Sequence, residues 1–168
     1  MGYRLIGCLF VVICPFLIGL EMRSRLRVRI RSLEMLRDYF RSVRRYISYV
    51  GMSLDDIAYE IDRGADKSKI SLIIREKTRQ TDFATSFSDA MDALHSALCI
   101  TADDQELLGS IARGIGGLDR EGALDYLQLA DEQISSVVEC ARARCETDGK
   151  IYVALGISGG IVAALMLL

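Results

Sequence analysis

Uncharged residues fill both ends of the chain and leave a charged segment between them. Residues 5–20 and residues 151–168 contain no charged side chain. Each run approaches the ~20 apolar residues that a helix needs to cross a bilayer, the first with a snorkelling Arg4 beside it. The pattern therefore predicts transmembrane helices at residues 1–20 and 151–168, with a domain of residues 21–150 between them.

A cleaved signal peptide is the alternative interpretation of the first run, which has a suitable length and a basic residue in front. Its end, Ile18-Gly19-Leu20, matches a small-x-small cleavage site poorly. A retained anchor is therefore favoured.

Apolar residues repeat every seven positions in two parts of the central segment, with the 3-4 spacing of a helix seam. The first set is Leu33, Leu36, Phe40, Val43, Ile47 and Val50, and the second is Leu127, Ala130, Ile134, Val137, Val138 and Ala141. The sets predict helices over 21–50 and 119–149, each roughly 45 Å long. We expect them to pair antiparallel as a hairpin, with the glycines of 114–117 and the shorter helices at its far end.

Residues 25–31 alternate arginine with apolar residues, which taken alone indicates a strand. The segment joins two helical stretches without Gly or Pro, so we interpret it as helix. Pro15 is the single proline of the chain, which allows long helices after it.

Four shorter helices are predicted between the long ones. Gly51 ends the first long helix, Ser53 caps the next, and Gly64 ends that one. Further helical patterns cover 67–80, 86–99 and 102–113, capped in the last two cases by Ser86 or Ser88 and by Thr101. The predicted fold class is all-α, a helical bundle built on a long antiparallel helix pair with a transmembrane helix at each terminus.

Charge is strongly polarised along the chain, although the total is only −2. Residues 21–45 carry a net +6, and residues 46–150 carry a net −9. By the positive-inside rule the central domain is cytoplasmic and both termini face outward. We expect a cell-membrane protein that crosses the bilayer twice.

Five arginines next to the first apolar run are candidates for contact with anionic lipid headgroups: Arg23, Arg25, Arg27, Arg29 and Arg31. Nucleic-acid binding is the alternative. The run borders the membrane segment and has no interleaved aromatic residue before Tyr39, so lipid contact is favoured and no nucleic-acid partner is expected.

Enzymatic signals are weak. Asp92, His95 and Cys99 share one face of a predicted helix, but alanines and leucines surround them, which favours a packing role. The glycines at 109–117 lack the Gly-Lys-Ser/Thr of a phosphate loop. The five cysteines are interpreted as small apolar fillers rather than disulfides. We expect no enzyme activity, no metal and no cofactor.

Four short motifs follow one another along the chain: Tyr49-Val50-Gly51-Met52-Ser53-Leu54, Ser86-Phe87-Ser88-Asp89-Ala90-Met91, Gly117-Leu118-Asp119-Arg120-Glu121, and Tyr152-x-x-Leu155-Gly156 with Gly159 and Gly160. In order and spacing they resemble the stage III sporulation protein AB family. That family is similar to the cytoplasmic domain of the F-type platform proteins of type II secretion.

The resemblance implies a non-enzymatic platform or adaptor in the secretion-like channel between mother cell and forespore, in the mother-cell membrane. Its implied partners are a secretion-type ATPase and other membrane proteins of the same complex, and self-association into a homo-oligomer is left open. A membrane-anchored helical regulator or sensor, binding a small ligand or a signalling protein, is the alternative.

Two further sites follow from the predicted hairpin. Its tip would display Asp55, Asp56, Asp119 and Glu121, which we predict to contact the ATPase. Gly156, Gly160 and Ala164 are spaced by four residues and form a small-residue face on the last helix, which predicts helix–helix packing in lipid.

Overall fold

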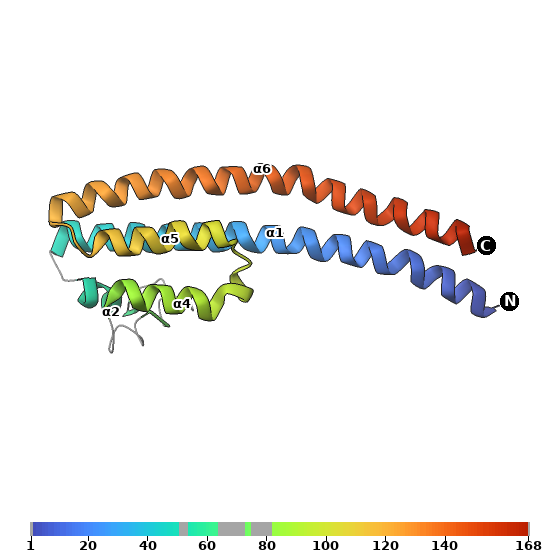
Figure 1. Cartoon of the computed structure of the whole chain (residues 1–168), viewed down its shortest axis with the longest axis horizontal. Coiled ribbons are helices and arrows are strands. Elements are labelled where there is room, and N and C mark those ends of the chain that lie inside the picture. Colours follow the sequence, from blue (N-terminus) through green and yellow to red (C-terminus); the bar gives the residue numbers. More distant parts are fainter. Residues whose placement is uncertain (1, 51–53, 64–72, 75–81, 168) are drawn as a thin grey trace. The chain divides into compact units, whose positions relative to one another are not determined.

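The computed structural model describes the chain except for residues 1, 51–53, 64–72, 75–81 and 168. Within these ranges the chain forms, in order, α1 (Gly2–Val50), α2 (Leu54–Arg63), α4 (Phe83–Leu98), α5 (Ala102–Ile115) and α6 (Arg120–Leu167) (Figure 1). The described residues include no β-strand, so the predicted all-α class is confirmed. The arginine-alternating segment 25–31 is helical, as predicted.

The chain divides into two compact units. Met1–Ile30 and Glu139–Leu168 form the terminal unit, and Arg31–Val138 forms the second unit, which we call the helical body. Among the residues whose side chains are described, no helix has a stretch long and apolar enough to cross a membrane. Most side chains of residues 1–20 and 151–168 lie outside that description, and the two predicted spans stay a prediction.

Within the helical body, α1 and α6 pair antiparallel along the predicted seam. Arg37 donates a hydrogen bond to Asp131, and Arg44, further along α1, donates one to Gln128, which comes earlier on α6. The two helices therefore run in opposite directions. The buried seam residues are Leu33, Leu36, Phe40, Val43 and Ile47 on α1, and Leu127, Ala130, Ile134 and Val138 on α6. Burying each larger aliphatic side chain contributes roughly 1.5–3 kcal/mol, so this seam holds the helix pair together.

An aromatic cluster joins α4 to α1. The ring of Phe87 lies 5.3 Å from that of Phe40 and 6.4 Å from that of Tyr39, measured between centroids, and Phe83 stands beside it at 6.3 Å. The Tyr39 hydroxyl has no hydrogen-bond partner within the described part of the body. Burial raises the pKa of this phenol above its usual value, which keeps it neutral.

Helix α5 packs through a buried apolar face of Leu108, Ile111, Ala112 and Ile115. Tyr126 on α6 reaches across and donates its hydroxyl proton to the carbonyl oxygen of Ser110 at 3.3 Å. Gly114 leaves room for that ring, because a Cβ there would lie 2.5 Å from the Tyr126 ring carbon Cζ.

The position of the shorter helices differs from the prediction. We predicted them at the far end of the hairpin, but α4 and α5 run alongside the long helices (Figure 1). Their apolar faces find a partner there, because the sides of α1 and α6 offer more apolar surface than a hairpin tip. The glycine turn after α5 does lie at the end of α1, since Arg120 donates to the carbonyl oxygens of Ile47 and Ser48.

The predicted start of α5 is confirmed. Thr101 Oγ1 accepts from the backbone N–H of Asp104, and Asp104 Oδ2 accepts from the N–H of Thr101 at 2.9 Å. This reciprocal capping box satisfies two backbone donors at the helix N-terminus.

The predicted start of α4 is wrong. Asp82 is the N-cap, and Ser86 lies inside the first turns, where its hydroxyl donates to the carbonyl oxygen of Asp82 at 2.9 Å. Ser88 also lies within the helix. The helix begins earlier because Phe83 is buried and extends the apolar face. Cys99, not a glycine, ends it in the left-handed conformation, with φ of 52°.

Helix α2 covers the segment predicted between Gly51 and Gly64. The proposed cap Ser53 and both glycines lie outside the described residues. So does most of the helix predicted at 67–80, of which only residues 73 and 74 are described, both helical.

Candidate interaction surfaces

Two of the four acidic residues predicted for the hairpin tip lie where α6 begins. Asp119 Oδ1 accepts from the backbone N–H of Gly122 at 3.2 Å, so this carboxylate caps the helix. Glu121 is exposed in the first turn, where the helix dipole favours an acid. Helix capping therefore gives Asp119 a structural role beside any partner contact.

The other two tip residues, Asp55 and Asp56, lie in the first turn of α2. Asp56 is exposed, and the side chain of Asp55 is outside the described residues. Only residues 51–53 separate α1 from α2, so α2 starts within about 14 Å of the end of α1. Both acidic turns thus belong to the same end of α1, where Arg120 binds the carbonyl of Ile47.

The five candidate lipid-binding arginines, Arg23, Arg25, Arg27, Arg29 and Arg31, all lie on α1. Arg25 Nε lies 3.2 Å from Glu21 Oε1, and both side chains are about two-thirds exposed. Such a surface pair contributes at most about 1 kcal/mol, which leaves Arg25 able to exchange partners. Contact of this segment with lipid stays a prediction.

The small-residue face of Gly156, Gly160 and Ala164 lies on α6, whose helix continues to Leu167. The three side chains are outside the described residues, so their packing stays a prediction. Gly159 beside them has open space where a Cβ would stand.

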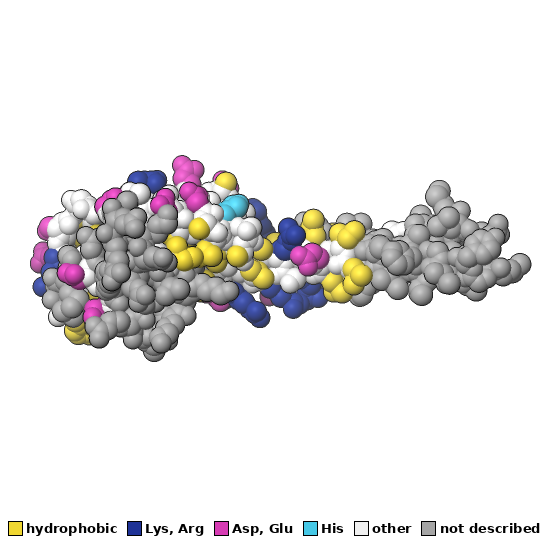
Figure 2. Space-filling model, turned by 90° about the horizontal axis from the view of Figure 1, so that it is seen from below, with side chains coloured by type: hydrophobic (Ala, Val, Ile, Leu, Met, Phe, Trp, Pro, Cys, Tyr) yellow, Lys and Arg dark blue, Asp and Glu magenta, His cyan; other side chains and the backbone are white. Residues whose placement is uncertain are grey.

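The residues Asp92, His95 and Cys99 do not form a bonded set. Asp92 accepts a hydrogen bond from the Gln105 side chain on α5, and the Cys99 thiol lies 3.6 Å from the carbonyl oxygen of Ser96. His95 is exposed, and the single histidine of the chain is visible at the surface in Figure 2. The hydrogen bond of Asp92 joins α4 to α5, and His95 lies at the surface. The helix face around His95 is more exposed than the packing face that we predicted.

Among the described residues, no group of three or more His, Cys, Asp or Glu could hold a metal ion. The described cysteines, Cys99, Cys140 and Cys145, are free. Cys140 is exposed, so it does not act as the apolar filler we expected.

An ion-pair network that sequence analysis missed ties α1 to α6. Arg37 Nε and Nη2 donate to the two carboxylate oxygens of Asp131 at 2.8 and 2.9 Å. Arg41 does the same from one turn further on, at 2.7 and 3.1 Å. The hydrogen bonds from Arg37 and then Arg41 hold the pKa of Asp131 well below its usual range, so the carboxylate stays charged.

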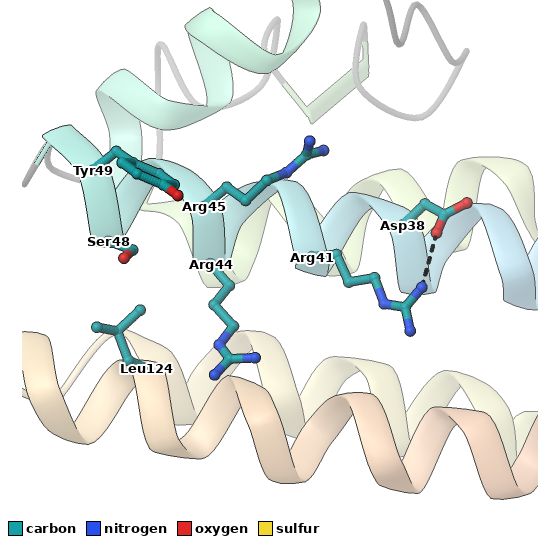
Figure 3. A pocket seen from close by; sticks show the side chains of 7 residues that line it. All are labelled: Asp38, Arg41, Arg44, Arg45, Ser48, Tyr49 and Leu124. Carbon is teal, nitrogen blue, oxygen red and sulfur yellow. Dashed lines mark ion pairs between the residues drawn. The ribbon is translucent and has the colours of Figure 1, made fainter.

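Beside this network α1 and α6 form an open cavity of about 660 Å³, which we call the arginine groove. Its lining residues are Asp38, Arg41, Arg44, Arg45, Ser48 and Tyr49 on α1, with Leu124 on α6 (Figure 3). Sequence analysis counted these arginines only as part of the +6 segment. Their spacing of three and four residues, which puts them on one side of a helix, was the available signal.

The fold and these surfaces define an all-helical protein built on a long antiparallel helix pair, whose candidate sites are charged surfaces. The family model of stage III sporulation protein AB matches residues 4–168, and the chain therefore belongs to that family. Membership gives it a role at stage III of sporulation. No curated protein and no solved structure gives a significant match.

Proposed function

We propose that the chain is a non-enzymatic platform or adaptor of the sporulation channel between mother cell and forespore. The helical body couples a cytosolic secretion-type ATPase to the other membrane proteins of the complex. In this proposal the chain lies in the mother-cell membrane around the forespore, crosses it with residues 1–20 and 151–168, and keeps its centre in the cytoplasm.

The antiparallel pairing of α1 and α6 is the observation that favours this role most. Each helix is unbroken from the buried seam to one of the two uncharged runs of the sequence. A hairpin of this kind, anchored through both ends, holds its body at one side of the bilayer. The surplus of arginine between residues 21 and 45 indicates that this side is the cytoplasm.

The acidic tip is the proposed ATPase contact. Asp56, Asp119 and Glu121 stand at surface positions of two turns that belong to the same end of α1, with Asp55 next in the chain. A partner surface rich in Lys and Arg would be steered toward these acids, and its association would weaken with salt.

The test is ATPase binding by the full chain in detergent micelles. One variant carries Asp55, Asp56 and Glu121 changed to Lys and Asp119 changed to Asn, because Asn keeps the cap of α6. A control carries the same change of charge at other exposed acids, with Glu106, Glu132 and Glu139 changed to Lys and Asp103 to Asn.

At low salt the tip variant should bind the ATPase about tenfold or more weakly, and the control should bind as the unsubstituted chain does. Equal binding by the tip variant would place the contact on another surface. An unsubstituted chain that does not bind the ATPase at all would contradict the coupling role.

A further inference from the structure

We propose that the arginine groove binds an acidic helical segment of a partner protein. This surface adjoins the acidic tip, because it reaches Ser48 and Tyr49 at the end of α1, but it carries the opposite charge. A chain with both would contact two partner surfaces of different chemistry, one basic and one acidic.

The charges of the groove are only partly neutralised within the chain. Arg41 is paired with Asp131 at 2.7 Å and with Asp38 at 3.7 Å. Arg44 donates to the neutral amide oxygen of Gln128 at 2.8 Å, and Arg45 donates to the hydroxyl of Ser42 at 3.0 Å. Within the described part of the chain, these last two guanidinium groups have hydrogen-bond partners but no carboxylate.

Among the residues described, Arg44 and Arg45 bond only neutral oxygens, and an acidic ligand would replace these with stronger hydrogen bonds. A hydrogen bond from Arg to a carboxylate is about twice as strong as one to a neutral oxygen. Gln128 and Arg45 are both exposed, and the buried Ser42 hydroxyl keeps its own bond to the carbonyl oxygen of Asp38. Exchange of the two arginine bonds for a carboxylate therefore requires no opening of the core. Arg41 would stay on Asp131, which keeps the groove in shape while a ligand binds.

The shape of the groove favours an extended ligand over a compact anion. The lining residues of α1 run from Asp38 to Tyr49, which corresponds to about 17 Å of helix. In Figure 3 the Arg44 side chain extends toward α6, whereas that of Arg45 extends away from it. Because the two guanidinium groups diverge, a single phosphate cannot meet both, but a helix with carboxylates about one turn apart can.

Apolar contact is available at the same place. The Tyr49 side chain is 86% exposed at the end of α1, and Leu124 on α6 faces the groove (Figure 3). A large exposed aromatic beside arginines is the combination enriched at protein interfaces. We therefore expect a partner helix that has at least two acidic residues a turn apart and an apolar residue next to them.

The experiment uses the full chain in sporulating cells, with Tyr49 replaced by the photoreactive residue p-benzoylphenylalanine. After irradiation, the crosslinked peptide is identified by mass spectrometry. We expect a protein segment with two or more Asp or Glu residues within one helical turn.

The arginines are tested in the same crosslinking background. Arg44→Gln together with Arg45→Gln should lower the yield of this crosslink about tenfold, because two charge pairs are lost. The matched control, Arg113→Gln with Arg144→Gln, removes two exposed arginines elsewhere and should leave the yield unchanged. Thermal melting of each variant verifies that the helical body is folded.

Four outcomes would overturn the proposal: a crosslink to phospholipid, a crosslink to a second copy of the chain, a yield that Arg44 and Arg45 do not affect, or no crosslink above that of unirradiated cells. ATPase binding by the acidic-tip variant is a separate measurement, so the two proposals fail independently.

Discussion

Asp131 shows how a single carboxylate can join two helices that are distant in sequence. It accepts four hydrogen bonds from Arg37 and Arg41, both on the partner helix. The side chains of Asp131 and Arg37 are about three-quarters buried, so their charges depend on each other for solvation.

Replacing Asp131 by Asn should lower the free energy of unfolding by about 2 kcal/mol, because the charge-assisted bonds are lost and two guanidinium groups face each other. Urea unfolding of the full chain in detergent, followed by circular dichroism, measures this loss. Asp125→Asn, at an exposed position of the same helix, should change stability by less than about 0.5 kcal/mol.

The lowered pKa of Asp131 predicts a pH dependence of stability that the unsubstituted chain shows and Asp131→Asn lacks. The folded pKa of Asp131 lies below that of the unfolded chain, which is about 3.9. Its stabilisation is therefore complete above that value and is lost as the pH falls through the folded pKa. The unsubstituted chain should lose more stability than Asp131→Asn between about pH 5 and pH 2. Parallel acid titrations of the two proteins would contradict this assignment.

At the scale of single helices, the capping box of α5 is a measurable contribution. Thr101→Ala removes the hydroxyl that accepts from Asp104 and should cost about 1 kcal/mol, whereas Thr101→Ser keeps the oxygen and should cost less. Thermal or urea unfolding of the two variants compares them. Equal stability would mean that the Asp104 side chain alone satisfies the end of the helix.

The small-residue face of α6 leads to a prediction about the terminal unit. Gly156→Leu with Gly160→Leu should weaken helix association, because bulky side chains prevent close approach of backbones in lipid. Disulfide crosslinking between cysteines placed at Leu17 and Ile151, both exposed in the terminal unit, reports the change. Gly159→Leu is the control, since open space surrounds that position. Unchanged crosslinking in the double variant would count against the prediction.

Local patterns predicted elements well where the signal is short-range. The burial of Leu36 and Ile134 could be predicted because a seven-residue repeat reveals the buried face of a helix without knowledge of its partner. The Thr101 cap could be predicted because it depends on residues only three positions apart. The start of α4 was missed because the burial of Phe83 decided it. The Arg37–Asp131 pair joins residues 94 apart, a pairing that no local pattern can specify.

Across the whole molecule, basic and acidic side chains are concentrated in different parts of the chain, and the pairing of α1 with α6 brings some of them together. Arginines gather between residues 21 and 45, and the later part of the chain is acidic. The structure shows that some of this charge is internal, since Arg37 and Arg41 bind Asp131. Other charges stay at the surface, among them those of the acidic tip and the arginine groove.

In the proposed function the helical body lies in the cytoplasm and both ends of the chain cross the membrane. The most direct test is labelling by a membrane-impermeant thiol reagent, in chains stripped of their five native cysteines. One chain carries Ser48→Cys, at an exposed position of α1, and the other has a cysteine appended after Leu168. In intact vegetative cells that express the chain, whose membrane faces the medium, the appended cysteine should be labelled and Ser48→Cys should react only after lysis. Labelling of Ser48→Cys in these intact cells would contradict the proposed topology.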